Sequence, residues 1–208
     1  MFMLTSFNPG SGKSFLAMNI AMSFAIKKKR ILVIDGDLRH GSTSSYADAP
    51  KTGLSDYLGN RVSDWKEIIV KDEKYDNLHI IPIGTVPPNP TELLEDGKLA
   101  TLIEVLRSEY DYIFIDCSPI DIVADAQIIE KLADRTVFVV RSGLLDRSML
   151  PELENIYQEK RFKNLSVILN GTESAGGRYG YRYGYRNGYS SYYGSKGKMG
   201  GGKWVVIK

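Results

Sequence analysis

The residues best suited to chemistry form a glycine-rich loop at positions 7–14, with the sequence FNPGSGKS. The loop follows a short apolar segment and precedes a helical pattern, as a Walker A phosphate-binding loop does. Backbone N–H groups in such a turn, with the dipole of the following helix, attract phosphate. Lys13 would reach the β- and γ-phosphates of ATP, and the Ser14 hydroxyl would bind Mg²⁺. The predicted nucleotide contacts are Gly10, Ser11, Gly12, Lys13, Ser14 and Phe15.

The loop departs from the Walker A pattern at its first position, where Phe7 replaces the usual glycine. The sequence therefore does not predict the shape of the loop, although the lysine and the hydroxyl that end the motif are retained. A simpler interpretation is a glycine turn that ends a strand and precedes Lys13 and Ser14 by chance. Acidic residues downstream favour the phosphate loop.

Three aspartates follow two apolar segments with the character of buried strands. Asp35 and Asp37 follow residues 31–34, and Asp116 follows residues 112–115. Ligands of an open α/β sheet collect at the carboxyl ends of its strands, so these acids are predicted to face the phosphate loop. A lone aspartate there is commonly a helix cap or a turn residue, but three of them downstream of such a loop indicate a site.

Mg²⁺ prefers oxygen ligands and uses few carboxylates. We therefore predict Ser14, Asp35 and Asp116 as metal ligands. Two acids spaced i, i+2 can also divide their roles, one holding metal and the other accepting a proton. The sequence leaves open which of Asp35 and Asp37 is the base. The predicted catalytic residues are Lys13, Asp35, Asp37 and Asp116.

Apolar, β-branched segments alternate with helical patterns along the chain. The predicted strands are 3–5, 31–34, 79–83, 112–115, 136–140 and 166–169. The predicted helices are 13–26, 91–108, 123–132 and 148–160, with a weaker helical pattern at 64–70. This alternation predicts an α/β fold, an open, mostly parallel sheet with helices on both faces.

Composition divides the chain into a predicted domain at 1–174 and a tail at 175–208. From Gly176 onward there are seven Lys and Arg and no acidic residue, so residues 1–175 keep 20 of the 27 basic and all 25 acidic residues, a net charge of −5. Residues 178–193 are nearly all Gly, Tyr, Arg and Ser, and we expect them not to fold alone. The apolar end at 204–207 is expected to dock on the domain or to add a strand.

Single residues outside these motifs carry weaker signals. Cys117 is the one cysteine, so an internal disulfide and an iron–sulfur cluster are excluded, and a small buried residue is the better interpretation. Neither His40 nor His79 has metal-ligand spacing. Residues 27–30, KKKR, are more typical of a helix end than of a binding patch.

The combined motifs resemble the bacterial tyrosine kinases (BY-kinases), the cytoplasmic kinase domains of capsule and exopolysaccharide export systems. The matching segments are the phosphate loop, 31–39, 112–119, the loop at 84–94, 123–126, 139–141 and the C-terminal tyrosine cluster. By this resemblance, Asp35 and Asp37 correspond to the Walker A′ acids and Asp116 to the Walker B acid. Asn170 corresponds to an adenine contact, although its chemistry alone also fits a turn. The predicted phosphate acceptors are Tyr179, Tyr181, Tyr183, Tyr185, Tyr189, Tyr192 and Tyr193.

The resemblance implies an ATP- and Mg²⁺-dependent tyrosine kinase that phosphorylates its own tail and regulates polysaccharide synthesis and export. It implies as partners neighbouring copies of the chain, a membrane polysaccharide co-polymerase or activator domain, fused or separate, and a tyrosine phosphatase. It also implies a position at the inner face of the plasma membrane, held there by the membrane partner. Relatives carry helices before the first strand, where this sequence has none, so we expect weak self-assembly.

Three other functions compete with the kinase. A switch ATPase of the partition and septum-site type shares the fold and the acidic motifs. Many such ATPases carry a lysine at the position of Asn8, and its absence, with the tyrosine tail, favours the kinase. A silent regulator of polysaccharide chain length is disfavoured by the intact Lys13 and Ser14. The Arg-Tyr-Gly tail could bind single-stranded nucleic acid, but no RNA-binding fold accompanies it, so no nucleic-acid partner is expected.

Overall fold

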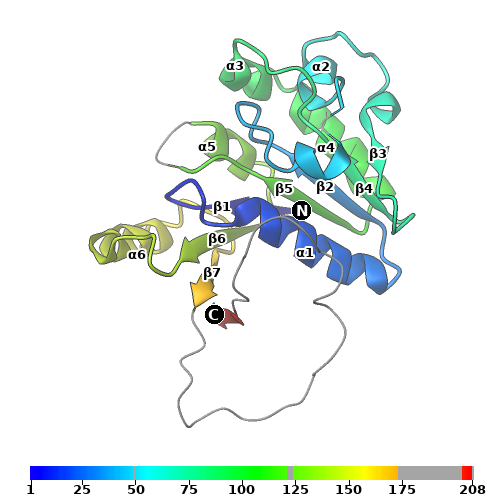
Figure 1. Cartoon of the computed structure of the whole chain (residues 1–208). Helices are drawn as coiled ribbons and strands as arrows, with labels where there is room; N and C mark the ends of the chain where they lie inside the picture. The colour runs from blue at the N-terminus through cyan, green and yellow to red at the C-terminus, as the bar shows by residue number, and fades with distance from the viewer. Residues whose placement is uncertain (49, 121–123, 173–202, 208) are drawn as a thin grey trace.

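The computed structural model describes residues 1–48, 50–120, 124–172 and 203–207 (Figure 1). Within these ranges, eight strands form one sheet in the order β3-β4-β2-β5-β1-β6-β7-β8. The strands are β1 (Phe2–Thr5), β2 (Ile31–Asp35), β3 (Val70–Lys71), β4 (Leu78–Ile81), β5 (Tyr112–Asp116), β6 (Arg135–Arg141), β7 (Ser166–Thr172) and β8 (Lys203–Ile207). The six inner strands are parallel, and the two edge strands, β3 and β8, are antiparallel to their neighbours. The predicted α/β fold is confirmed.

Helices connect the parallel strands and cover both faces of the sheet, as Figure 1 shows. The α-helices are α1 (Lys13–Ile26), α2 (Leu54–Leu58), α3 (Pro90–Glu95), α4 (Lys98–Glu109), α5 (Asp125–Glu130) and α6 (Leu150–Gln158). The 3₁₀ helices are η1 (Ser44–Ala47), η2 (Trp65–Ile68) and η3 (Arg147–Met149).

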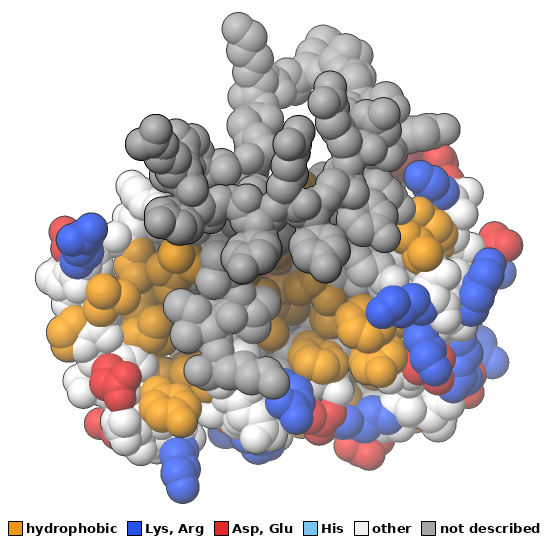
Figure 2. All heavy atoms as spheres, turned by 90° about the horizontal axis from the view of Figure 1, so that it is seen from below, with side chains coloured by type: hydrophobic (Ala, Val, Ile, Leu, Met, Phe, Trp, Pro, Cys, Tyr) orange, Lys and Arg blue, Asp and Glu red, His pale blue; other side chains and the backbone are white. Residues whose placement is uncertain are grey.

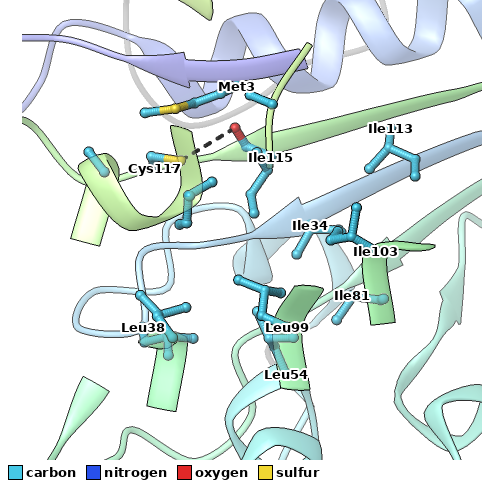
Figure 3. Close-up of a cluster of buried hydrophobic side chains, with 14 of the residues drawn as sticks. Met3, Ile34, Leu38, Leu54, Ile81, Leu99, Ile103, Ile113, Ile115 and Cys117 are labelled. Carbon is cyan, nitrogen blue, oxygen red and sulfur yellow. Dashed lines mark hydrogen bonds between the residues drawn. The ribbon is translucent and has the colours of Figure 1, made fainter. Parts of the chain in front are cut away.

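The continuous apolar character of β2 follows from burial of both its faces. Leu32 and Ile34 belong to a larger core that also includes residues of α2 to α6. Ile31 and Val33 point the opposite way, into a smaller core packed under α1. Figure 3 shows part of the larger core, in which Ile34 lies among side chains from several helices and strands. One strand therefore joins both cores and presents its final carboxylate, Asp35, at the edge of the sheet.

The surface seen from below Figure 1 carries hydrophobic side chains among groups of Lys and Arg (Figure 2). On α1, Phe15 and Ile26 are 49% and 48% exposed. In Figure 2 the hydrophobic side chains gather across the middle of this face, with charged side chains mainly toward its rim. In the ranges that the structure describes, no helix has the length and apolar character needed to cross a bilayer.

Several element boundaries differ from the sequence prediction. The single helix predicted at 91–108 is wrong, because Gly97 adopts a left-handed conformation (φ 81°) that ends α3 and starts α4. The pattern at 64–70 forms only η2 and the start of β3, and the helix predicted at 148–160 begins as η3. The helix predicted at 123–132 is shorter, and residue 123 lies outside the described residues. Three further elements, α2, η1 and β3, were not predicted from the sequence.

The C-terminal end is described only where it joins the sheet. The expectation that 204–207 docks or adds a strand is confirmed, because β8 pairs with β7. The residues expected not to fold alone, 178–193, lie outside the described residues. A division at residue 174 therefore stays a prediction. The sequence 27–30 follows the end of α1, as predicted.

Gly97 provides a test of the break between α3 and α4. A Cβ there would meet no atom within 4 Å, so the left-handed backbone is the only obstacle to a side chain. We expect Gly97→Ala to lower the free energy of unfolding by about 1–2 kcal/mol. Gly97→Asn should cost less, since Asn tolerates this conformation. Urea unfolding of both variants measures the difference, and equal stabilities for the Gly97→Ala variant and the wild-type protein would contradict the assignment.

Candidate nucleotide-binding site

The glycine-rich loop connects β1 to α1 and turns through two left-handed glycines. Gly10 has φ 73° and Gly12, the N-cap of α1, has φ 91°. A Cβ on Gly12 would lie 2.3 Å from Asn170 Nδ2, so a side chain there would have to displace Asn170 and would also strain the left-handed backbone. The hydroxyl of Ser11 donates to the carbonyl oxygen of Asn8 at 2.8 Å and closes the turn. The loop is therefore shaped by its own backbone at the N-terminus of a helix of 14 residues.

Two side chains from neighbouring strands hold the loop from outside. Asn170 Nδ2 donates to the carbonyl oxygen of Ser11 at 2.8 Å, and Arg141 Nη1 donates to the carbonyl oxygen of Gly10 at 2.6 Å. Asn170 and Arg141 are register partners on β7 and β6. Both bonds end on carbonyl oxygens of the loop, so they fix its backbone without using its N–H groups. Asn170 thus contacts the loop from within β7, and its predicted contact with adenine stays a prediction.

Phe7, the departure from the Walker A pattern, is a core residue. It is 3% exposed, and its ring meets Phe138 edge to face with centroids 4.8 Å apart. The glycines that turn the loop lie three and five residues further on and keep their left-handed conformations. Phe7 therefore adds packing beneath the loop and leaves the turn itself in place.

The register of the sheet brings the acidic motifs beside this loop. In β2 and β5, Asp35 and Asp116 are register partners, and Asp116 is also paired with Leu4 of β1. The parallel strands β1, β5 and β2 therefore end at one edge, from which the phosphate loop also leaves (Figure 1). Lys13, Ser14 and Asp37 all lie close enough to Asp116 to shift the pKa of its carboxyl group. The structure thus brings together Lys13, Ser14, Asp35, Asp37 and Asp116.

A segment after β2 supplies hydrogen bonds to both buried acids. Thr43 Oγ1 donates to Asp116 Oδ2 at 2.7 Å. The backbone N–H and the hydroxyl of Ser44 each donate to Asp35 Oδ2, both at 2.7 Å. Thr43 and Ser44 were not predicted as site residues. The hydroxyl-rich sequence STSS at 42–45 could have indicated them, because it follows the paired acids closely.

Each buried acid keeps one oxygen without a hydrogen bond. Asp35 and Asp116 are 0% and 1% exposed, and the Oδ1 atom of each has no hydrogen-bond partner among the described residues. A buried, unpaired carboxylate oxygen is costly, and two such oxygens beside a glycine-rich loop could accept a cation. Mg²⁺ is commonly bound by one or two carboxylates with phosphate and water completing its shell. The donor set fits that ion.

The electrostatics of the two acids agree with this interpretation. Burial raises the pKa of Asp35 to about 7, against the opposing hydrogen bonds from Ser44 and with a further contribution from the Asp116 charge. Burial also raises the pKa of Asp116, while hydrogen bonds from Ser14 and Thr43 and the charge of Lys13 lower it. A bound cation would favour the ionised form of both groups.

The remaining predicted residues are placed less centrally. Asp37 is 7% exposed, and its Oδ1 lies 3.2 Å from both the backbone nitrogen of Arg39 and His40 Nδ1. Phe15 is half exposed on α1. Cys117 is fully buried, and burial raises the pKa of its thiol, as predicted for a small core residue. The seven tail tyrosines lie outside the described residues.

One cavity of about 330 Å³ lies away from these groups. It is lined by Ile120, Gln127, Glu130, Glu152, Arg161 and Phe162. None of the predicted site residues is among them. In the described ranges, no three His, Cys, Asp or Glu side chains cluster closely enough to hold a metal by themselves. The chemistry of the chain therefore centres on the phosphate loop and its two neighbouring strands.

The raised pKa of Asp35 predicts how stability depends on pH without ligand. Folding raises this pKa from 3.8 to about 7, so within that interval the folded chain binds more protons than the unfolded chain. The contribution of Asp35 to the free energy of unfolding therefore falls as pH rises, by up to about 1.4 kcal/mol per pH unit. Asp35→Asn removes the effect, so its stability relative to wild type should rise between about pH 4 and about pH 7. Parallel urea-derived stability curves for the two proteins would contradict the burial argument.

Known proteins share both the sequence and the fold of this chain. Residues 3–142 match the family described as AAA domain. The tyrosine-protein kinase CpsD of Streptococcus pneumoniae is 34% identical over 179 residues, which are 85% of this chain and 78% of that protein. The kinase domain of the Escherichia coli tyrosine kinase ETK matches with a TM-score of 0.76 at 31% identity, over 88% of this chain and 71% of that one.

The septum site-determining protein MinD of Pyrococcus horikoshii, solved with Mg-ADP, matches more distantly. Its TM-score is 0.64 at 20% identity, over 80% of this chain and 68% of that one. At this identity the likeness shows the fold alone. The kinase relatives are similar to this chain at 31–34% identity over most of their length, and the ETK kinase domain also shares its fold. With its nucleotide-binding P-loop fold, the chain belongs to the bacterial tyrosine kinase family.

Proposed function

We propose that this chain is a protein-tyrosine kinase that uses Mg²⁺ and ATP and phosphorylates tyrosines of its own C-terminal tail. One observation carries the proposal within this family. The register of β1, β5 and β2 places the phosphate loop beside two buried carboxylates, Asp35 and Asp116, each with an unpaired oxygen. Phosphoryl transfer requires a loop that positions the phosphates and carboxylates that hold a metal ion beside them.

Each residue has a role that its position supports. The N–H groups of the loop and the Lys13 ammonium bind the β- and γ-phosphates, and Lys13 neutralises charge that develops during transfer. Ser14, Asp35 and Asp116 would hold Mg²⁺. When bound, the ion would supply further neutralisation of phosphate charge. Lys13 is 9% exposed, so water screens its charge little.

The transfer itself needs a base for the tyrosine proton. The tyrosine oxygen forms a bond to the γ-phosphorus as the bond to the bridging β–γ oxygen breaks, and ADP leaves. Asp37 accepts the proton in our assignment. Asp35 is fully buried with two donors on Oδ2, which suits a metal ligand, whereas Asp37, at 7% exposed, is the less buried of the two acids.

The tail suits the role of acceptor because of its sequence. Its seven tyrosines lie among glycine, arginine and serine residues, and its seven positive charges are opposite in sign to the net charge of −5 on residues 1–175. Coulomb attraction favours approach of the tail to the acidic site of a neighbouring copy. Each phosphotyrosine adds about −1.5 to −2 charges, so four or five would cancel the tail's positive charge and release it. In the proposed nucleotide site, Asn170 would also contact the adenine of ATP.

The partners follow from the family. A membrane polysaccharide co-polymerase or activator domain, fused or separate, would hold the kinase at the inner face of the plasma membrane, and a tyrosine phosphatase would reverse its action. The output is regulation of capsule or exopolysaccharide synthesis and export. These assignments rest on the kinase relatives and on the tyrosine tail.

A switch ATPase is the second candidate, because MinD shares this fold. A switch ATPase would transfer the γ-phosphoryl group of ATP to water, whereas the kinase transfers it to a tyrosine. The position where many such ATPases carry an extra lysine is Asn8 here, and its carbonyl oxygen accepts from Ser6 and Ser11 as part of the turn. The tyrosine cluster and the kinase relatives favour phosphoryl transfer to protein.

Lys13→Met tests the assignment of the phosphate loop. Loss of one preorganised positive group should reduce autophosphorylation by at least about 10²-fold. Phosphate incorporation from ATP measures the effect, and circular dichroism checks the fold. Lys29→Met, at an exposed lysine beyond the end of α1, should keep full activity. Near-normal activity in the Lys13→Met variant would exclude the proposed site.

Replacing all seven tail tyrosines by Phe tests the acceptor. We expect self-phosphorylation to be nearly abolished while ATP binding is retained, because the site itself is unchanged. Mass spectrometry of the wild-type protein after incubation with Mg-ATP locates the phosphate. Phosphate mainly on Tyr46, Tyr57 or Tyr75 of the body would show that the tail is not the acceptor.

A further inference from the structure

Asp125, the first residue of α5, is a buried carboxylate that no proposed role in catalysis has used. It is 0% exposed. Thr91 Oγ1 donates to its Oδ1 at 2.7 Å, and Arg39 Nε donates to its Oδ2 at 3.3 Å. A carboxylate removed from water is costly unless its oxygens are paired, so these two donors are what make its burial possible.

A third hydrogen bond closes this group into a triangle. Arg39 Nη2 lies 3.0 Å from Thr91 Oγ1. Arginine can only donate, so the threonine oxygen must accept from it and direct its own proton to Asp125. Every hydrogen bond of the triangle therefore has one allowed direction. We name Arg39, Thr91 and Asp125 the clasp.

The clasp joins three separate segments around the site. Arg39 lies in the turn after β2, Thr91 in the first turn of α3, and Asp125 at the start of α5. Each is short or irregular, and α3 and α5 have six residues each, so local helix stability alone does not fix them. Side-chain hydrogen bonds between such segments fix their relative positions.

The clasp also connects to the proposed base. The backbone N–H of Arg39 donates to Asp37 Oδ1 at 3.2 Å, so the residue whose side chain is clamped also orients the Asp37 carboxylate. We propose that Arg39 is a positioning residue, which uses the clasp to hold Asp37 where it can accept the tyrosine proton. This rests on the proposed function of the site. Arg39 acts through Asp37 and does not itself contact the reacting atoms.

Arg39→Lys is the sharpest test because it keeps the positive charge and removes the planar guanidinium group that contacts two partners at once. A single ammonium cannot reproduce the planar, two-point contact with Asp125 and Thr91. We expect kcat for tyrosine phosphorylation to fall by about 10²-fold, as for a catalytic group displaced by about 1 Å. KM for ATP should stay within about 2-fold, because the phosphate loop binds the nucleotide independently.

Arg61→Lys is a matched control, since Arg61 also pairs with a buried aspartate, Asp56, at 3.5 Å. It should leave kcat unchanged, as Asp56 lies outside the site. Thr91→Val should reproduce the Arg39→Lys effect, and the double variant should be no worse than either single one. Unchanged kcat in Arg39→Lys, or an equal loss in Arg61→Lys, would overturn the proposal.

A second measurement keeps this test separate from the kinase assignment. Amide hydrogen exchange of residues 37–41 should become at least about 10-fold faster in Arg39→Lys, and not in Arg61→Lys, because the turn loses its anchor. Exchange is measured whether or not the protein is a kinase. If wild-type protein transferred no phosphate to tyrosine, the proposed function would fail, and unchanged exchange would independently overturn the clasp.

Discussion

Parallel pairing of β1, β5 and β2 is the constraint on which the site depends. Because β5 lies between the other two, Asp116 is the register neighbour of both Leu4 and Asp35. A shift of one residue in either pairing would turn a carboxylate from one face of the sheet to the other. The apolar residues before each acid prevent such a shift, since they fill two cores at once.

Burial gives the site its chemical character. The same packing that fixes Asp35 and Asp116 removes them from water and raises both pKa values. Thr43 and Ser44 satisfy one oxygen of each acid and leave the other oxygen for a cation. Burial of two neighbouring carboxylates is electrostatically costly, and a bound cation would lower that cost.

The sequence predicted most of the sheet and the central residues, because strong local patterns specify them. Apolar segments that end in aspartate, and glycines before Lys13, are visible without a structure. The break at Gly97 was missed because the helical pattern continues across it, and only the backbone conformation reveals the boundary. Contacts over long separations were also missed. The bond between Arg39 and Asp125 spans 86 residues, and no spacing rule relates such positions.

The most direct test of the central claim is calorimetric titration of ATP with and without Mg²⁺. Wild-type protein should bind ATP at least about 10-fold more tightly with Mg²⁺, and Asp116→Asn should abolish that difference, because the unpaired carboxylate would no longer hold the ion. Asp134→Asn, at an acid paired with Arg107 away from the site, should keep it. Equal Mg²⁺ dependence in the wild-type and Asp116→Asn proteins would contradict the account.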